Sequence, residues 1–299
     1  MTRRQSWIAG VAVALLLAGT AALQARLERA RPPAADLPGF LYIDSPGVLQ
    51  RLALSYDALV ADIYWIRTIQ HYGGVRLSEN PVKRYDLLLP LLDLTTSLDP
   101  HFRAAYLYGA IFLAEPEPSG AGRPHDAVRL LEKAMRAQPD NWVFAQQAGF
   151  VNYWYLRDFT GAAQWFGRAA EMPGAPEWLK PLEAVTLTQG GDRATSRRLW
   201  TSILQDSDSD LLQESARLRL SQIDALDAID GLEALVRRFT DRTGRAATHW
   251  DDLIAAGWLR GLPYDPAGVP FVLQPDGEVV LSPHSPLNPL PVEPPSLGS

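Results

Sequence analysis

The sequence predicts an all-α protein, an α-solenoid of paired helices between an N-terminal transmembrane helix and a small C-terminal α+β tail. Three observations support this prediction. An uncharged apolar run opens the chain, small and large apolar residues recur at helical spacing through its middle, and two short apolar runs flank Asp276-Gly277 near its end. The 299 residues suffice for one extended repeat domain or two compact domains.

Residues 1–31 are expected to form a signal anchor and a juxtamembrane helix. Arg3 and Arg4 precede an uncharged stretch, residues 5–24, which reaches the ~20 residues that a membrane helix needs. A cleaved secretory signal peptide is the alternative, because the alanine-rich end of the stretch offers cleavage sites. Basic residues flank both sides of the stretch, so the positive-inside rule does not decide which end is cytoplasmic. We place the N-terminus in the cytoplasm because the stretch is similar to a secretory signal. We expect a single-pass protein of the bacterial inner membrane with its bulk in the periplasm.

A proline-rich linker, residues 32–46, leads to a helical domain expected over residues 47–240. Leu59, Ile63 and Ile66 recur at helical spacing and predict one helix over residues 47–72, packed by Trp65 and with a polar outer face. Asn80-Pro81 is expected to begin the next helix, which runs to Leu98. Helices at 104–114, 126–138, 142–172 (a pair) and 177–203 (a pair) follow, and residues 210–240 form one or two capping helices.

The strongest repeat signal lies at residues 127–139. Ala127, Leu131 and Ala134 place small, large and small residues on one helix face, and Pro139 ends that helix. The same pattern recurs at Ala162, Phe166 and Ala169. Ser196, Trp200 and Ile203 occupy the equivalent sites in the last unit, where the match weakens as expected of a terminal repeat. On these residues, the region 88–203 resembles a tetratricopeptide-repeat (TPR) array. The resemblance implies a scaffold that binds other proteins rather than a catalyst.

In such arrays the first helix of each pair lines the concave binding face. Here those helices are expected at 104–114, 142–155 and 177–188. The candidate partner contacts on them are Tyr108, Gln146, Asn152 and Tyr153. The alternative is that both tyrosines are core residues and that only the polar pair is exposed.

The tail, residues 241–281, is predicted to fold as a small α+β module. It contains a short helix at 250–256, a turn at 265–268, and a hairpin of residues 271–273 and 279–281 around Asp276-Gly277. Its Arg-Thr-Gly, Ala-Ala-Gly-Trp-Leu and Asp-Pro-x-Gly-x-Pro-Phe motifs resemble the C-terminal module of type II secretion pseudopilins. That resemblance implies a setting in pilus or secretion assembly. Pseudopilins can bind calcium there, but only Asp265 has a counterpart here, so we predict no metal. The proline-rich residues 282–299 are expected to be disordered.

Composition and motifs exclude several other classes. The chain has no cysteine, which excludes disulfides, thiol catalysis and cysteine metal sites. Its net charge of -6 leaves no basic surplus for nucleic acid. The five histidines lack metal-ligand spacing. We therefore expect no cofactor and no small-molecule substrate.

The leading functional hypothesis is a membrane-tethered scaffold that binds protein partners in the bacterial envelope. A permanent structural subunit of a larger membrane complex is the second hypothesis, and a large exposed apolar surface would favour it. An enzyme with an unrecognised site is the third.

Overall fold

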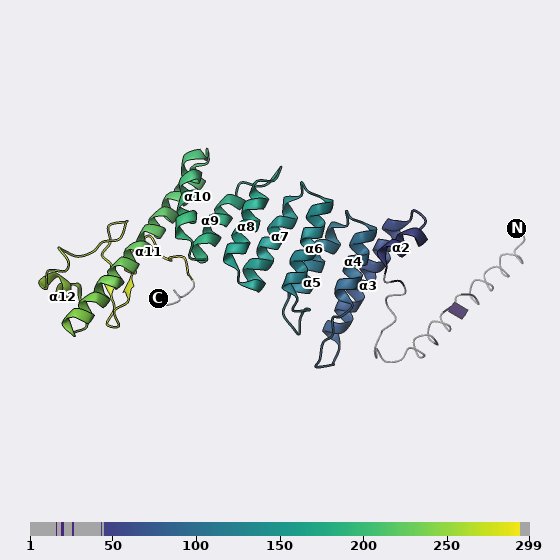
Figure 1. Cartoon of the computed structure of the whole chain (residues 1–299), viewed down its shortest axis with the longest axis horizontal. Coiled ribbons are helices and arrows are strands. Elements are labelled where there is room, and N and C mark those ends of the chain that lie inside the picture. Colours follow the sequence, from purple (N-terminus) through teal and green to yellow (C-terminus); the bar gives the residue numbers. More distant parts are fainter. Residues whose placement is uncertain (1–15, 17–18, 21–25, 27–42, 44, 294–299) are drawn as a thin grey trace, which may run out of the picture. The chain divides into compact units, whose positions relative to one another are not determined.

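The computed structural model describes residues 16, 19–20, 26, 43 and 45–293. Contacts divide the chain into two units, residues 1–45 and 46–299, and every labelled helix and strand belongs to the second (Figure 1). The predicted anchor at residues 5–24 lies outside the described residues, apart from residues 16, 19 and 20. None of the helices in the described part of the chain combines the length and apolarity that a membrane crossing requires.

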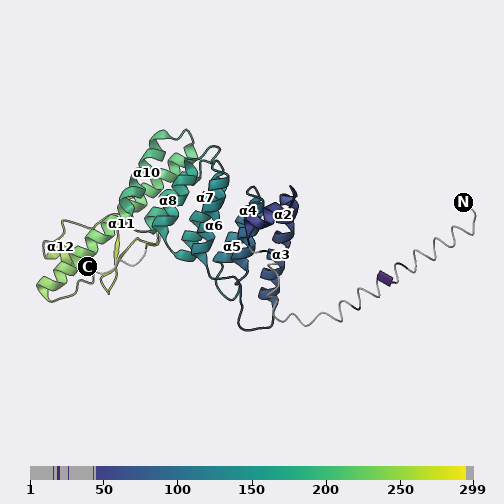
Figure 2. The ribbon, with the colours of Figure 1, turned by 45° about the vertical axis from the view of Figure 1, so that its right-hand side comes forward.

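The second unit is mostly helical. Its elements are α2 (Pro46–Leu52), α3 (Asp57–Leu77), α4 (Leu88–Leu98), α5 (Arg103–Ala114), α6 (Pro124–Ala137), α7 (Trp142–Val151), the π-helix η1 (Asn152–Leu156), α8 (Phe159–Ala170), α9 (Leu179–Gln189), α10 (Arg193–Asp206), α11 (Asp210–Thr243), α12 (Trp250–Ala255), β1 (Val272–Leu273) and β2 (Val279–Val280). From α3 to α11 each helix packs on the next, and α5 also packs on α7. Figures 1 and 2 show helices α3 to α10 following one another in chain order as a row of antiparallel neighbours. The predicted all-α, solenoid-like architecture is confirmed at this level.

The residues of the small-large-small pattern lie in the helix contacts of this row. Ala127, Leu131 and Ala134 of α6 have 0% exposure. Their counterparts on α8 and α10 are also buried: Ala162, Phe166, Ala169, Ser196, Trp200 and Ile203. Because alanine and serine leave room for a neighbouring backbone, the large residue between them can fill the space between two helices.

Two glycines permit the closest approaches between helices. A Cβ atom on Gly109 of α5 would lie within 3.0 Å of the Leu92 side chain of α4. A Cβ atom on Gly149 of α7 would come equally close to the Phe166 ring of α8. Each glycine therefore sets the distance between its helix and a neighbour.

The buried small residues give a direct test of the helix packing. Ala134→Leu and Ala127→Leu should each lower the free energy of unfolding by about 1–3 kcal/mol, because added methylenes overpack a filled interface. Urea unfolding followed by circular dichroism measures this loss. Ala137→Leu, at a half-buried position at the end of the same helix, is the matched control. Equal stability of all three variants and the parent would contradict the packing described here.

The predicted helix over residues 47–72 is wrong, because the chain forms two helices there. Leu54 and Ser55 have φ of 48° and 75°, in the left-handed region, which breaks the helix between α2 and α3. Neither residue type favours that conformation, so the sequence carried no signal for the break.

The segment before α4 also differs from the prediction. Asn80-Pro81 starts a turn, and the helix begins only at Leu88. Within that segment Tyr85 is buried, and its hydroxyl donates to the carbonyl of Pro118 at 3.0 Å. This long-range contact fixes the segment in a non-helical conformation. Residues 210–243, in contrast, form the single helix α11, which ends at Gly244 with φ 68°.

The C-terminal module has the predicted hairpin. Strands β1 and β2 pair antiparallel, with Val272 opposite Val280, and the loop between them closes through the Gln274 amide and the Glu278 carbonyl at 2.8 Å. Trp250 of α12 donates from Nε1 to the carbonyl of Phe271 at 2.8 Å. The core of the module also contains side chains of α11, namely Ala225, Val236 and Phe239. The expected boundary at residue 240 therefore cuts through a helix that serves both parts.

The expectation of disorder over residues 282–299 is wrong for residues 282–293. Leu287 is buried, and Gln222 of α11 donates from Nε2 to the carbonyls of Leu287 at 2.8 Å and Pro289 at 3.0 Å. Composition suggested disorder because proline-rich segments bury little apolar surface by themselves. Here a buried side-chain amide on α11 binds the main chain of the segment. Residues 294–299 lie outside the described residues.

Candidate functional site

The four predicted partner contacts do not share one exposed surface. Tyr108 on α5 is 55% exposed, and Gln146 on α7 is half-buried. Tyr153 is also half-buried, and its hydroxyl donates to Oε1 of Gln189 on α9 at 2.8 Å. Tyr153 thus links two successive helix pairs. Tyr108 and Gln146 are the predicted residues whose position suits a partner contact.

Asn152 is only 6% exposed, so its assignment as an exposed contact is wrong. Its Nδ2 donates to the carbonyl of Ala148 at 2.8 Å, and its own carbonyl accepts from the amide of Asp158 at 3.1 Å. Asn152 is the first residue of η1, where a π-turn adds a residue to the helical repeat. At 3.6 residues per turn Asn152 continues the buried face of Ala145 and Ala148, so helical spacing by itself already places it in the core.

Trp154, in the same π-helix, was not predicted as a contact. It is 58% exposed, and its ring makes an edge contact with Tyr153 at a centroid distance of 4.8 Å. Residues 142–166 contain many aromatic side chains, most of which were expected to lie in the core, so nothing in the sequence distinguished Trp154 from them. Its position two residues after the buried Asn152 places it on the opposite, outer side of the helix.

An open cavity of about 510 Å³ lies between α6 and η1. Its lining includes His125, Arg129, Glu132, Asn152 and Asp158. Arg129 pairs with the buried carboxylate of Asp126, and Asp158 Oδ1 caps α8 by accepting from the Gly161 amide at 2.8 Å. These charged groups therefore stabilise their own helices. Nowhere in the described ranges do three histidine, aspartate or glutamate side chains gather as a metal site would require.

Asp265, the residue that the sequence analysis compared with the pseudopilin loop, is buried and bonded within the protein. Its Oδ1 accepts from the amides of Ala267 at 2.9 Å and Val269 at 2.8 Å. Its Oδ2 accepts from the Ser285 hydroxyl at 2.5 Å. Both oxygens hold the turn and the following segment in place.

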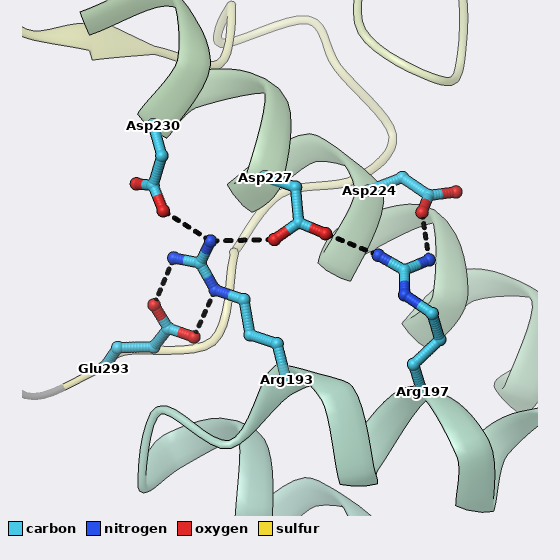
Figure 3. Close-up of polar contacts among 6 residues, drawn as sticks. All are labelled: Arg193, Arg197, Asp224, Asp227, Asp230 and Glu293. Atoms are coloured by element: carbon cyan, nitrogen blue, oxygen red, sulfur yellow. Dashed lines mark hydrogen bonds and ion pairs between the residues drawn. The ribbon is translucent and has the colours of Figure 1, made fainter. Parts of the chain in front are cut away.

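A cluster of ionic contacts joins α10, α11 and the end of the described chain (Figure 3). Arg193 donates from Nε and Nη2 to the two carboxylate oxygens of Glu293, at 2.7 and 2.5 Å. Its Nη1 reaches Asp227 at 2.9 Å and Asp230 at 2.6 Å, and Arg197 binds Asp224 and Asp227. The hydrogen bonds to Glu293 contribute most to raising the pKa of the Arg193 guanidinium. The cluster therefore holds α10, α11 and the segment at residue 293 together, because each guanidinium is shared among carboxylates of the same chain.

The outer side of α3 is an exposed apolar surface. Leu59, Ile63, Ile66 and Leu77 are 57%, 44%, 53% and 85% exposed. Together with Gly73 and Gly74 they follow one face of the helix at the spacing i, i+4, i+7, i+14, i+15, i+18, and we call this set the α3 stripe. Gln70, at i+11, is the exposed polar residue on the same face. The opposite face, with Ala61, Tyr64, Thr68 and Tyr72, is buried. The predicted polar outer face is therefore wrong, and the residues that predicted this helix are the ones it exposes.

Comparison with protein-family models, with curated proteins and with solved structures found no match.

Proposed function

We propose that this chain is a membrane-tethered scaffold of the tetratricopeptide type that binds protein partners in the bacterial envelope, in pilus or secretion assembly. In this proposal residues 5–24 hold it in the inner membrane, the helical unit lies in the periplasm, and no catalytic step is involved. The observation that carries the proposal is the repeated burial of one pattern. From Ala127 to Ala162 to Ser196, equivalent buried positions recur with the ~34-residue period of tetratricopeptide repeats.

The exposed aromatic residues of the first helices are the proposed partner contacts. Tyr108 lies on α5 and Trp154 at the end of the α7–η1 segment, each more than half exposed. Tyrosine and tryptophan dominate the binding energy of protein interfaces. Gln146, half-buried on α7, adds a polar group on the same set of helices. This arrangement suits a peptide or protein surface rather than a small molecule.

The test is affinity capture from detergent-solubilised native membranes with the full chain as bait. Tyr108→Ala with Trp154→Ala should lower the recovery of specific partners at least tenfold, because truncating two aromatic contacts typically costs 2 kcal/mol or more. The melting curve should change little, since both side chains are exposed. Tyr264→Ala, which removes a tyrosine of 58% exposure in the tail, is the matched control. Asn152 is unsuitable as a target because its burial would confuse folding with binding.

Unchanged recovery of every partner by the folded double variant would contradict the proposed contacts. Loss of partners in the Tyr264→Ala control instead would move the binding surface to the C-terminal module.

A permanent subunit of a larger membrane complex is the second candidate, and the α3 stripe favours it. A subunit of that kind buries its apolar surface against other chains at all times. Native electrophoresis of solubilised membranes separates the two candidates. A permanent subunit migrates only in one large complex, whereas a scaffold also migrates alone or as a small oligomer.

A further inference from the structure

The α3 stripe lies at the open end of the helix row. Among the described elements, α3 makes its extensive helix contact with α4 only, whereas the helices from α4 to α10 each pack between two neighbours. Figures 1 and 2 show α2 and α3 at the same end of the row. An apolar helix face is normally covered by a neighbouring element, and α3 has two such faces on opposite sides. We therefore expect another element or chain to cover the outer face of α3.

The shape of the stripe is complementary to itself. Its first half carries the large side chains Leu59, Ile63 and Ile66, and its second half contains Gly73 and Gly74. A Cβ atom on either glycine would have no heavy atom within 4 Å. The glycines thus leave a shallow notch on an exposed helix face, and no contact among the described residues requires them. Glycine costs about 0.5–1 kcal/mol of helix stability relative to alanine.

An antiparallel second copy of α3 fits this pattern. If the two helices cross level with Thr68, Ile63 of each copy lies over Gly73 of the other, and Leu59 lies opposite Leu77. Ile66 of each copy lies opposite Gln70 of the other, so every pair is repeated by the two-fold axis, as an isologous contact requires. The glycines allow the two backbones to approach closely.

Charges at the edge of the stripe match the same arrangement. Asp62 is exposed and has no ion pair among the described residues. Arg76 lies on the same edge about four turns along the helix, where its Nη1 pairs with Glu115 of the same chain at 2.9 Å while 43% of its side chain stays exposed. In the antiparallel pair Asp62 of each copy comes next to Arg76 of the other, whose guanidinium would then be shared between Asp62 and its own Glu115. On the opposite edge, Arg67 holds its guanidinium over its own Tyr64 ring, 5.4 Å from the centroid.

We propose that the α3 stripe is the contact between two copies of this chain, packed antiparallel about a two-fold axis level with Thr68. A lipid surface suits the stripe less well, because α3 contains no lysine and presents Asp62 at its edge, whereas membrane-surface helices carry basic polar faces. Contact with a different subunit would not explain why the two halves of the stripe are complementary to each other.

Cysteine crosslinking in the full chain tests this directly, because the parent contains no cysteine. In membranes treated with copper phenanthroline, Ile63→Cys with Gly73→Cys should give a covalent dimer on a non-reducing gel. Each single variant should give at least tenfold less, because the two copies of residue 63 lie ~15 Å apart along the antiparallel helices, beyond the ~7 Å Cα separation that a disulfide spans. Leu211→Cys with Leu218→Cys, two exposed positions on α11, is the matched control.

Crosslinking of the double variant no stronger than that of the control would overturn the proposal and leave the stripe to a lipid surface or another subunit. A strong dimer from Ile63→Cys alone would overturn the antiparallel arrangement. Adding Ile66→Arg to the double variant should reduce the covalent dimer about tenfold or more, because it places two like charges in the contact.

The glycines provide a second readout that separates dimerisation from folding. Gly73→Leu should raise the melting temperature of the monomer, because leucine favours the helix, and should abolish the dimer measured by light scattering in detergent. Gly231→Ala on α11, where a Cβ atom also has open space, should raise the melting temperature and leave the dimer intact. A dimer that survives Gly73→Leu would contradict the close approach at the notch.

Discussion

Phe166→Ala should lower the free energy of unfolding by about 3–5 kcal/mol. Phe166 has 0% exposure, and its ring makes an edge contact with Phe150 of α7 at a centroid distance of 5.2 Å. The neighbouring helices hold α7 and α8 in place, so the space left by the ring cannot close. Urea unfolding followed by tryptophan fluorescence and circular dichroism measures the loss.

A double-mutant cycle with Gly149 sharpens this prediction. Gly149→Ala alone should destabilise the protein, because its new Cβ would lie within 3.0 Å of the Phe166 ring. In the Phe166→Ala background the same change should cost much less, because it enters vacated space. Phe271→Ala, in the separate core of the C-terminal module, is the control and should be additive with Gly149→Ala. Additivity within about 0.5 kcal/mol for Gly149 and Phe166 would contradict their contact.

Asp265→Ala should destabilise the C-terminal module by about 3 kcal/mol, because it leaves two amides and the Ser285 hydroxyl without their charged acceptor. The loss should appear as faster proteolysis between residues 240 and 293, while the helix row from α3 to α9 stays resistant. Asp276→Ala, which removes a single exposed bond to the Glu278 amide, is the matched control and should cost less than 1 kcal/mol. Addition of calcium should stabilise neither variant nor the parent. A calcium-dependent rise in the melting temperature of the parent alone would show that Asp265 is a metal ligand after all.

The sequence predicted best where one local pattern determines packing. Ala127, Leu131 and Ala134 could be placed at a helix contact because small and large residues at that spacing are typical of closely packed helices. The hairpin around Asp276-Gly277 was predictable because that dipeptide favours the conformation a tight turn needs. In both cases the signal lies within a few residues.

The errors have non-local or conformational causes. Leu54 and Ser55 break a continuous apolar pattern through backbone conformation alone. The polar side chain of Asn152 suggested exposure, but it folds back to donate to the Ala148 carbonyl and is buried. Residues 282–293 are ordered by Gln222 and Arg193, which lie far away in the sequence. The α3 stripe was missed because periodicity shows that a helix has an apolar face but not whether a neighbour covers it.

The bond between Arg193 and Glu293 spans 100 residues of sequence, which changes how this end of the array unfolds. In a linear solenoid each repeat contacts only its neighbours, so terminal repeats fray independently and contact order stays low. Here α10 cannot open without releasing the end of the chain, and that end is also bonded to α11 through Gln222. We therefore expect helices α10 and α11 and the β1–β2 hairpin to open as one cooperative unit, with their slowest amide protons exchanging with solvent at a common rate.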